Sequence, residues 1–479
     1  MKKVMFLSLV LMLGNGVLKG QEVILDFPEM RSETSIVRQY PNNYDIALVY
    51  SYTNGDTTNH FFIGDLRNYS FRAVPFIPNA IVSDFEFVGD YVLFCGSLYG
   101  KAMFGFFNIQ PLLTSTGNVI FNYCQIPSTT ISKYDTLGNV IYSTTANHTQ
   151  ALKIDAYQAG SGFQAFLVVE AISNNSTTYH REVINIAGSS FSGIYQYKMA
   201  IYSDPTAVDF FSDVAVTQDY VAFVSHKNTG TGLYLHSVPR SNLASTFFLP
   251  PPFSIYDLFS NVSFYNWTES EPIVESIKEN TIAVAFYGHT NQQTLVNPGT
   301  DIMTFDLNYP NSQATLLNHN KTSYGTLYNH NAKMYELKCI PGIKTLSLLH
   351  HAPTSNTQCQ NRFDEYSNHA QNTTVHEIHD NDYTYFSSDA FSNDRFILSG
   401  IGSGSFDESA ITQKLYVHVP FQASCTLQYT FISSILGTND PNYGFGPQDN
   451  YYYGTGAFNI TTYSTPSFPI QYKIICNSK

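Results

Sequence analysis

Along most of the chain, apolar and polar residues alternate over short runs that end in Gly, Asn or Asp, and helical periodicity is nearly absent. A period of two is typical of β-strands, and clusters of Gly, Asn and Asp are typical of tight turns. The clearest unit, residues 83–94, consists of a strand, a turn at Gly89-Asp90 and a second strand. The pattern therefore predicts an antiparallel, all-β fold.

This strand–turn–strand unit recurs, with four clear copies and three weaker ones. The turn residues of the seven copies are Asn43, Asp90, Ser161, Asp219, Asn280, Gly342 and Asp394, at spacings of 47 to 71 residues. A period above about 40 residues built of antiparallel strands is the signature of a propeller blade. We therefore expect a β-propeller of seven four-stranded blades. The alternatives fit less well, because β-helices repeat at shorter periods and a pair of β-sandwiches would not explain seven copies.

Several copies continue into a third strand, at residues 103–109, 232–238, 301–307 and 414–419. With this strand, the units resemble the blades of secreted bacterial β-propeller repeat proteins over most of the chain. The resemblance is to a general repeat and to no specific family. The Gly-His and Trp-Asp marks of WD40 blades and the paired glycines of kelch blades are absent, and Trp267 is the single Trp.

A propeller has to join its first and last blades, because an open ring exposes two sheet edges. Strand-like segments at 22–27 and 470–475 supply the material at the two ends of the chain. We expect these segments to lie in the same blade or in adjacent ones and to close the ring. Cys476 directly follows the second segment, and we expect it to form a disulfide with Cys425.

The N-terminus predicts export. Lys2 and Lys3 form a positive region, residues 4–13 are an apolar stretch too short to span a bilayer, and small residues precede Gln21. We interpret residues 1–20 as a signal peptide and 21–479 as a single β-propeller domain, in the periplasm, on the cell surface or outside the cell. No later apolar stretch is long enough to predict a transmembrane segment.

The charge balance narrows the choice of partners. The net charge is −13, and loss of Lys2, Lys3 and Lys19 with the signal peptide takes it to −16. An acidic surface repels nucleic acids and anionic membranes. We expect the ligand to be a glycan or a protein. Aromatic residues make up 15% of the chain and charged residues only 13%, which excludes a disordered protein.

The chain has six cysteines, an even number that permits three disulfides in an exported protein. Six cysteines allow 15 connectivities, so the pairing stays open. The simplest arrangement joins neighbours in sequence: Cys95 with Cys124, Cys339 with Cys359, and Cys425 with Cys476. No Cys-x-x-Cys is present, which argues against zinc ribbons and thioredoxin chemistry.

An acidic residue opens six of the seven units, five or six positions before the turn. These residues are Asp84, Asp155, Asp213, Glu275, Glu336 and Asp389. The first strand of a blade is innermost, so we expect the six carboxylates to ring one mouth of the central channel. There they are candidate ligand-binding residues, for a divalent cation such as calcium or for a polyhydroxylated ligand. The alternative is structural, with each carboxylate accepting backbone N–H bonds from the loop between blades.

Half of the 14 histidines lie within one stretch of about 60 residues: His319, His330, His350, His351, His369, His376 and His379. The last two lack His-Glu-x-x-His spacing, and residues i and i+3 of a strand face opposite sides. We interpret the cluster as polar residues of a loop insertion. Two tyrosine-rich segments, 439–444 and 449–454, suit stacking on sugar rings, or else pack against the domain.

No catalytic signature appears: the nucleophile elbow, the phosphate loop and the dinucleotide fingerprint are all missing. The sequence therefore predicts an exported scaffold that binds a ligand or a protein. The alternative is a carbohydrate-active enzyme, a glycoside hydrolase or lyase, with its site at the channel mouth. Two facing carboxylates are enough for glycoside hydrolysis, but no catalytic pair can be singled out among the 37 acids.

Overall fold

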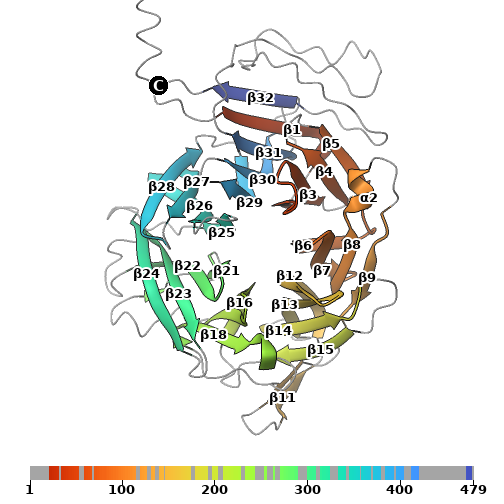
Figure 1. The fold of residues 1–479 in the computed structure, drawn as a ribbon, viewed down its shortest axis with the longest axis vertical. Coiled ribbons are helices and arrows are strands. Elements are labelled where there is room, and N and C mark those ends of the chain that lie inside the picture. The colour runs from red at the N-terminus through yellow and green to blue at the C-terminus, as the bar shows by residue number, and fades with distance from the viewer. Residues whose placement is uncertain are drawn as a thin grey trace, which may run out of the picture.

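The computed structural model describes residues 21–419, interrupted by gaps between strands, and residues 471–476. Seven antiparallel sheets of four or five strands stand around a central channel (Figure 1). The protein is therefore an all-β, seven-bladed propeller, as the repeat predicts. Helical structure in the described part is limited to α2 (Gln110–Leu113) and the 3-10 turn Arg240–Asn242. No described helix has the length and apolar character needed to cross a membrane.

Each of the first four blades has four strands, and strands that follow one another in the sequence are neighbours in the sheet. Blade 1 consists of β2 (Thr34–Gln39), β3 (Ile46–Tyr52), β4 (His60–Asp65) and β5 (Ser70–Pro75). Blade 2 consists of β6 (Ala80–Val88), β7 (Tyr91–Leu98), β8 (Lys101–Asn108) and β9 (Asn122–Gln125). Blade 3 consists of β12 (Ala146–Ala159), β13 (Gly162–Ser173), β14 (Tyr179–Gly188) and β15 (Tyr197–Tyr202). Blade 4 consists of β16 (Asp209–Val216), β17 (Tyr220–Lys227), β18 (Leu233–Pro239) and β19 (Phe253–Ser254). A separate hairpin, β10 (Ile131–Tyr134) with β11 (Val140–Thr144), lies between blades 2 and 3 in the sequence.

The other three blades complete the ring. In blade 5, β20 (Ser263–Phe264) and β21 (Ile273–Lys278) both pair with β22 (Thr281–His289), which is followed by β23 (Gly299–Asn308) and β24 (Gln313–Ser323). Blade 6 consists of β25 (Lys333–Ile340), β26 (Thr345–Ser355), β27 (Gln358–Ser367) and β28 (Asn372–Ile378). Blade 7 combines β29 (Tyr383–Ser392), β30 (Arg395–Ser403) and β31 (Ile411–Val419) with β1 (Gln21–Arg31) and β32 (Gln471–Cys476).

The predicted turns join the first and second strands of the blades. All seven predicted turn residues fall between these two strands in the chain order. In blade 2 the hairpin between β6 and β7 closes through Gly89, whose φ of 61° lies in the left-handed region that glycine enters without strain. The repeat read from the sequence is therefore the inner hairpin of each blade.

The two ends of the chain close the ring as predicted. β1 lies between β31 and β32, antiparallel to both, so that Gln21 is opposite Val419 on one side and Cys476 on the other. Figure 1 shows β1 and β32 along the outer side of blade 7. The predicted partner of Cys476, Cys425, lies outside the described residues, so that disulfide stays a prediction.

The hydrophobic core lies between neighbouring blades. Phe61 of blade 1 has its ring centroid 5.5 Å from that of Phe85 and 5.3 Å from that of Phe107, both in blade 2. The second strands of blades 1 and 2 are covered on both faces, so β3 is buried at every position before Tyr52 and β7 at every position after Tyr91. This arrangement explains why these strands are continuous apolar runs with little alternation.

Two of the predicted disulfides are wrong. Cys95, Cys124 and Cys339 are thiols. Cys95 of β7 lies opposite Phe104 of β8, which in turn lies opposite Cys124 of β9. With strands about 4.8 Å apart, the two Cα atoms are about 9–10 Å apart, beyond the reach of roughly 7 Å for a disulfide.

The Cys339–Cys359 pairing fails for the same geometric reason. Cys339 lies on β25 and Cys359 on β27, with β26 between them. Their neighbours on β26 are Leu346 and Pro353, which lie toward opposite ends of that strand. Sequence proximity is therefore a poor guide to pairing within a blade, where consecutive strands separate the cysteines.

These thiols make the cysteine chemistry testable. Protein unfolded in guanidinium chloride without reductant should react with a thiol reagent at Cys95, Cys124 and Cys339, giving at least three thiols per chain. The double variant Cys95→Ser/Cys124→Ser should lower the measured number by two. If the double variant and the wild type give the same number of thiols, Cys95 and Cys124 are oxidised in the wild type and the geometric argument is wrong.

Candidate functional site

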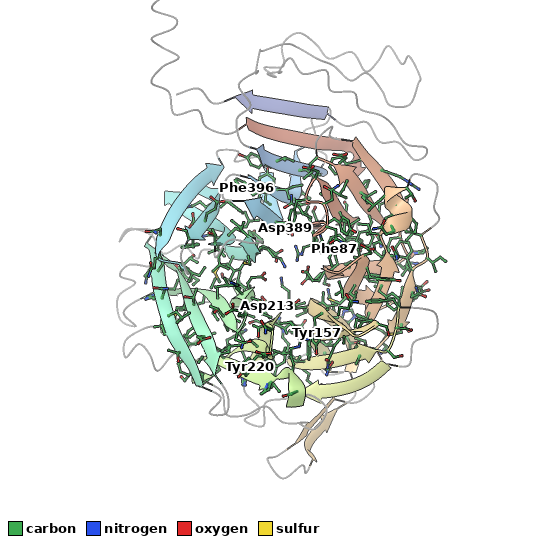
Figure 2. The ribbon with its side chains drawn as sticks, viewed as in Figure 1. Phe87, Tyr157, Asp213, Tyr220, Asp389 and Phe396 are labelled. Atoms are coloured by element: carbon green, nitrogen blue, oxygen red, sulfur yellow. The ribbon has the colours of Figure 1, made fainter. Side chains whose placement is uncertain are left out.

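All six acids singled out in the sequence line one pocket of about 250 Å³ in the central channel. Figure 2 shows two of them, Asp213 and Asp389, directed toward the centre of the ring. They reach the channel because each lies on the first, innermost strand of its blade. Their predicted position beside the channel is confirmed, and their role in ligand binding stays a prediction.

Most of these carboxylates join one blade to the next. Asp84 accepts a hydrogen bond from the backbone N–H of Phe85 (2.9 Å) and another from Ile154 of blade 3 (3.3 Å). Asp213 likewise accepts bonds from Val214 (2.9 Å) and from Val274 of blade 5 (2.9 Å). In each case one oxygen bonds its own strand and the other bonds the neighbouring blade.

Three other inter-blade junctions use the same device. Asp155 accepts a bond from the N–H of Val216 in blade 4 (2.6 Å), and Glu275 accepts one from Cys339 in blade 6 (3.2 Å). Asp389 of blade 7 accepts a bond from Gln39 of blade 1 (2.6 Å) across the closure of the ring. Five of the six acids thus accept backbone N–H bonds, as the structural alternative expects. The donors, however, lie in the inner strand of the next blade and not in a loop.

Glu336 is the exception among the six. It accepts hydrogen bonds from two side chains, Arg38 (3.2 Å) and Ser387 (3.0 Å). Arg38 belongs to blade 1, the blade that contributes no acid to the six, and it lines the same pocket. In the one blade that lacks the repeated acid, a basic residue, Arg38, therefore lines the pocket.

Sequence reasoning missed four charged residues of the pocket: Arg38, Glu86, Lys153 and Lys338. Three of them carry a usable signal. Glu86 lies two positions after Asp84, Lys153 two before Asp155, and Lys338 two after Glu336. Alternate residues of a strand share a face, so each of these side chains accompanies its neighbouring acid into the channel.

The charged residues fall into two groups, which an ion pair of 3.7 Å between Arg38 Nε and Glu86 Oε2 connects. The first, called here the inner group, comprises Arg38, Asp84, Lys153, Asp213 and Glu336. Arg38 is its centre, with Nη2 2.7 Å from Asp84 Oδ1 and Nη1 3.2 Å from Glu336 Oε2, and its side chain is 2% exposed. Burial opposes the charge on Arg38, but Glu336 and Asp84 outweigh burial and raise its pKa. Lys153 also stays protonated, because the same two acids and Asp213 outweigh burial and raise its pKa.

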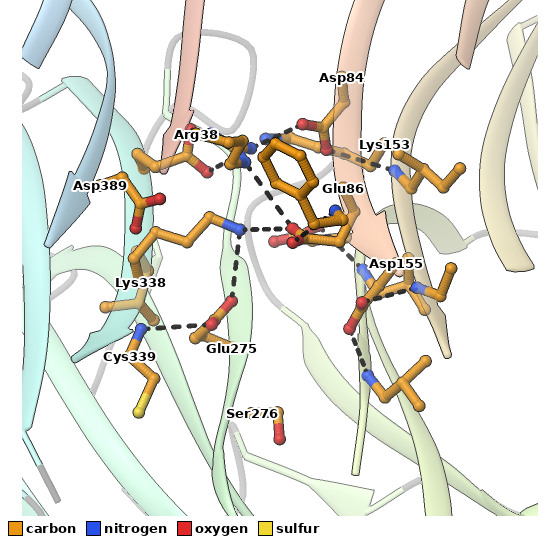
Figure 3. A pocket seen from close by; sticks show the side chains of 18 of the residues that line it. Arg38, Asp84, Glu86, Lys153, Asp155, Glu275, Ser276, Lys338, Cys339 and Asp389 are labelled. Atoms are coloured by element: carbon orange, nitrogen blue, oxygen red, sulfur yellow. Dashed lines mark hydrogen bonds and ion pairs between the residues drawn. The ribbon is translucent and has the colours of Figure 1, made fainter. Parts of the chain in front are cut away.

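The second, called here the mouth group, comprises Glu86, Asp155, Glu275, Lys338 and Asp389. Lys338 Nζ lies 3.3 Å from Glu86 Oε2 and 3.9 Å from Glu275 Oε2, and Figure 3 shows its side chain reaching toward both. The Glu86 and Glu275 side chains are 25% and 21% exposed, against 8% for Asp84 in the inner group. The carboxylates Glu86 and Glu275 of the mouth group are therefore more exposed to solvent than Asp84 of the inner group.

Three carboxyl groups of the mouth group, those of Glu275, Asp155 and Asp389, have raised pKa values. Burial, with the charges of Asp155 and Glu86 adding to it against Lys338, raises the pKa of Glu275 to about 8. Burial together with Glu86 raises the pKa of Asp155 to about 7. Burial also raises the pKa of Asp389 to about 6. Raised pKa values at a pocket are typical of functional sites, although structural networks produce them too.

The pocket does not have the form of a calcium site. Within the part of the chain that the structure describes, no three carboxylate, imidazole or thiol groups converge as metal ligands do. Calcium takes six to eight oxygen ligands, whereas in this pocket Arg38 and Lys338 lie among the carboxylates and already pair with them. Of the two ligand classes expected from the sequence, a divalent cation and a polyhydroxylated ligand, the geometry therefore does not favour the cation.

The histidine cluster is not a loop insertion where the structure describes it. His319 lies in β24, His350 and His351 in β26, and His376 in β28. His350 Nε2 lies 2.9 Å from Asp364 Oδ2, and both side chains are fully buried. The loop interpretation is therefore wrong for these four residues, because each of them belongs to a strand of a blade. His330, His369 and His379 and the tyrosine-rich segments 439–444 and 449–454 lie outside the described residues.

Comparison with known proteins identifies no family. No protein-family model and no curated protein matches the chain. Similar solved structures include the β-propeller domain of Cps50 (Swd1) from Myceliophteria thermophila, with a TM-score of 0.44, 9% identity, and coverage of 81% of this chain and 96% of that one. Polysaccharide lyase Uly1 gives 0.47, 8%, 80% and 89%, and the periplasmic gluconolactonase PpgL of Pseudomonas aeruginosa gives 0.42, 10%, 82% and 95%. At these identities the likeness concerns the fold alone, and the function has to be argued from the pocket.

Removal of Arg38 should destabilise the ring. Arg38→Ala leaves the buried carboxylates of Asp84 and Glu336 without their counter-charge, and breaking such a buried ion pair costs about 3–5 kcal/mol. Lys278→Ala, which removes one partner of an exposed ion pair with Glu279, should cost less than about 1 kcal/mol. Urea unfolding of both variants measures the difference. Equal midpoints for the two variants would contradict a central role for Arg38.

The raised pKa values predict that stability falls as pH rises. Asp155, Asp213, Glu275 and Asp389 have folded pKa values of about 7, 6, 8 and 6, above the values of about 4 for unfolded carboxyls. The folded state binds more protons in this interval, so this contribution is complete below about pH 4 and is lost by about pH 8. Urea midpoints at pH 5 and pH 8 test the sign. Glu275→Gln should reduce the difference, and a midpoint that rises toward pH 8 would refute the assignment.

Proposed function

We propose that this protein is an exported β-propeller scaffold that holds a small polar ligand at the mouth of its central channel. The observation that carries the proposal is the pocket itself, to which each of the seven blades contributes a charged residue. Its volume of about 250 Å³ is below the roughly 300–1,000 Å³ of sites for drug-sized molecules, so the ligand is a small metabolite.

The way the carboxylates are held supports binding. The backbone hydrogen bonds of Asp155 and Glu275 fix their positions, while Glu86 and Lys338 remain partly exposed beside them. Fixed polar groups lose little freedom when a ligand arrives, which is the usual basis of affinity for polar molecules. A rigid ring that presents fixed polar side chains can bind a ligand without catalysing a reaction.

One observation favours the alternative, a carbohydrate-active enzyme. Glu275 and Asp155 share the pocket, and their pKa values are raised to about 8 and about 7, a property of general acids in glycoside cleavage. We rank this function second because both side chains already bond the backbone of a neighbouring blade. A general acid has to exchange its proton with substrate, and those bonds restrict its movement.

Export is part of the same proposal. The composition of residues 1–20 supports a signal peptide, and the closing strand β1 begins at Gln21. Cleavage after Gly20 would therefore leave the ring closure intact. The acidic charge of the remaining chain supports a ligand or partner other than nucleic acid.

Ligand screening by thermal shift tests the function. We expect at least one compound in a panel of monosaccharides, sugar acids, amino acids and diamines to raise the melting temperature, because a ligand of the folded state stabilises it by mass action. Calorimetry should then show that Glu86→Gln weakens binding. The matched control is Glu279→Gln, on an exposed turn away from the pocket.

Two results would contradict the proposal. One is a panel in which no compound shifts the melting temperature or gives a calorimetric signal. The other is cleavage of a polysaccharide by the wild-type protein that Glu275→Gln abolishes and Glu279→Gln preserves, which would make the protein an enzyme.

A further inference from the structure

The turn between β7 and β8 presents a tyrosine to solvent in a strained backbone conformation. The two strands are joined by Tyr99 and Gly100 alone, with φ of 52° and 70°. Turns of this kind favour Asn, Asp or Gly at the first position, because a bulky side chain at positive φ is strained. Tyr99 is 72% exposed, so burial of its ring does not offset the strain. Strain that packing does not repay is typical of residues that bind a ligand.

The tip of this hairpin is held in place by neighbouring strands. The backbone N–H of Thr149, in β12 of blade 3, donates to the carbonyl of Gly100 (3.0 Å), and the Thr149 hydroxyl accepts from the N–H of Ala102 (2.8 Å). Within blade 2, Gln125 of β9 donates from Nε2 to the carbonyl of Leu98 (2.8 Å). The turn is therefore anchored on two blades, and an anchored group loses little freedom when a ligand arrives.

Two exposed polar residues lie beside this turn, Asn79 and His148. Asn79 precedes β6 and has a φ of 60°, which Asn adopts more readily than most residues. Its Nδ2 lies 3.5 Å from the Tyr99 hydroxyl. His148 of β12 lies against the second turn residue, since a Cβ on Gly100 would be 2.9 Å from the imidazole Nδ1. The tyrosine ring thus has a neutral amide and an imidazole as neighbours.

This place is separate from the channel pocket. β7 begins after the turn at Gly89-Asp90 and ends at the turn that holds Tyr99, so the two turns lie at opposite ends of the strand. Neither Tyr99 nor its two polar neighbours line the pocket. A ligand held at Tyr99 would therefore bind independently of the small polar ligand proposed for the channel.

From these observations we propose that Tyr99 is the stacking residue of a second binding site, for the ring of a neutral sugar, with Asn79 and His148 beside it to bond hydroxyl groups. A pyranose ring has faces of C–H bonds and an edge of hydroxyls. The C–H face packs on an aromatic ring through dispersion and the negative charge of the ring face. Amide and imidazole groups donate and accept hydrogen bonds, as hydroxyls do.

The surroundings of Tyr99 favour a sugar over a protein partner. Anchor residues of protein interfaces are enclosed by contacts that exclude water, whereas the exposed residues near Tyr99 are polar: Asn79, Gln125 and His148. Tyr123, a second exposed tyrosine of blade 2, lies opposite Gly105, about 13 Å along β8 from the turn, and so does not extend the ring into an apolar patch. The net charge of −13 disfavours anionic polysaccharides.

Affinity electrophoresis of the folded protein, in gels that contain laminarin, xylan, galactomannan or soluble starch, tests the site. We expect at least one of these neutral polysaccharides to retard the wild type. Tyr99→Ala should weaken the binding about tenfold, and Tyr99→Phe should preserve it because the ring remains. The matched control is Tyr123→Ala, which removes the other exposed tyrosine of blade 2 and should migrate as the wild type does.

A third substitution separates strain from folding. Because Asn tolerates positive φ, Tyr99→Asn should raise the melting temperature by about 1–2 °C while it abolishes retardation. A residue that only stabilises the turn would behave differently, since its loss would lower the melting temperature and leave polysaccharide binding unchanged.

Two results would overturn the sugar site. The first is a wild type that none of the four polysaccharides retards; if that protein also sediments as a dimer and Tyr99→Ala as a monomer, the exposed ring is a contact between two copies of the chain. The second is retardation that Tyr99→Ala leaves unchanged, or that Tyr123→Ala reduces equally. Neither result bears on the channel pocket, whose ligand is tested by its own variants.

Discussion

The hydrogen bond from the backbone of one blade to the carboxylate of the previous one is the interaction on which the ring depends. Each blade is a separate sheet, so no main-chain ladder runs between neighbouring blades. A carboxylate with one oxygen on its own strand and the other on the next blade, as in Asp213, fixes both position and angle. The repetition of this bond around the ring explains why the acid recurs in the sequence.

This way of joining blades gathers negative charge in the channel, and the rest of the site follows from that concentration. Buried like charges are costly unless they are paired or protonated. The protein uses both solutions. Arg38 pairs with Asp84 and Glu336 and, at 3.7 Å, with Glu86. Lys338 pairs with Glu86 and Glu275, and the pKa values of Asp155, Glu275 and Asp389 are raised. The ligand site that we propose is the part of this network where basic side chains of the protein do not pair with every carboxylate.

The acids were predictable because blade geometry forces one position of each inner strand toward the channel, and the same polar type therefore recurs at one distance from each turn. Lys153 and Lys338 were missed although they lie two residues from Asp155 and Glu336, since a single lysine in one repeat leaves no periodic signal. The predicted disulfides Cys95–Cys124 and Cys339–Cys359 were wrong because sequence proximity does not show how strands are arranged within a blade. Nearness in sequence places Cys95 and Cys124 in one blade, but on strands that β8 separates.

The sequence by itself determined the strands, the seven inner hairpins, the blade number and the use of both chain ends in one blade. These are local or periodic properties, which alternation and turn residues record directly. Only the tertiary structure decided which charges meet, because side chains from blades far apart in the sequence converge across the channel. Arg38 lies almost 300 residues from Glu336 in the chain and 3.2 Å from it in space. The division into an inner and a mouth group, and with it the chemistry of the pocket, exists only once the ring has closed.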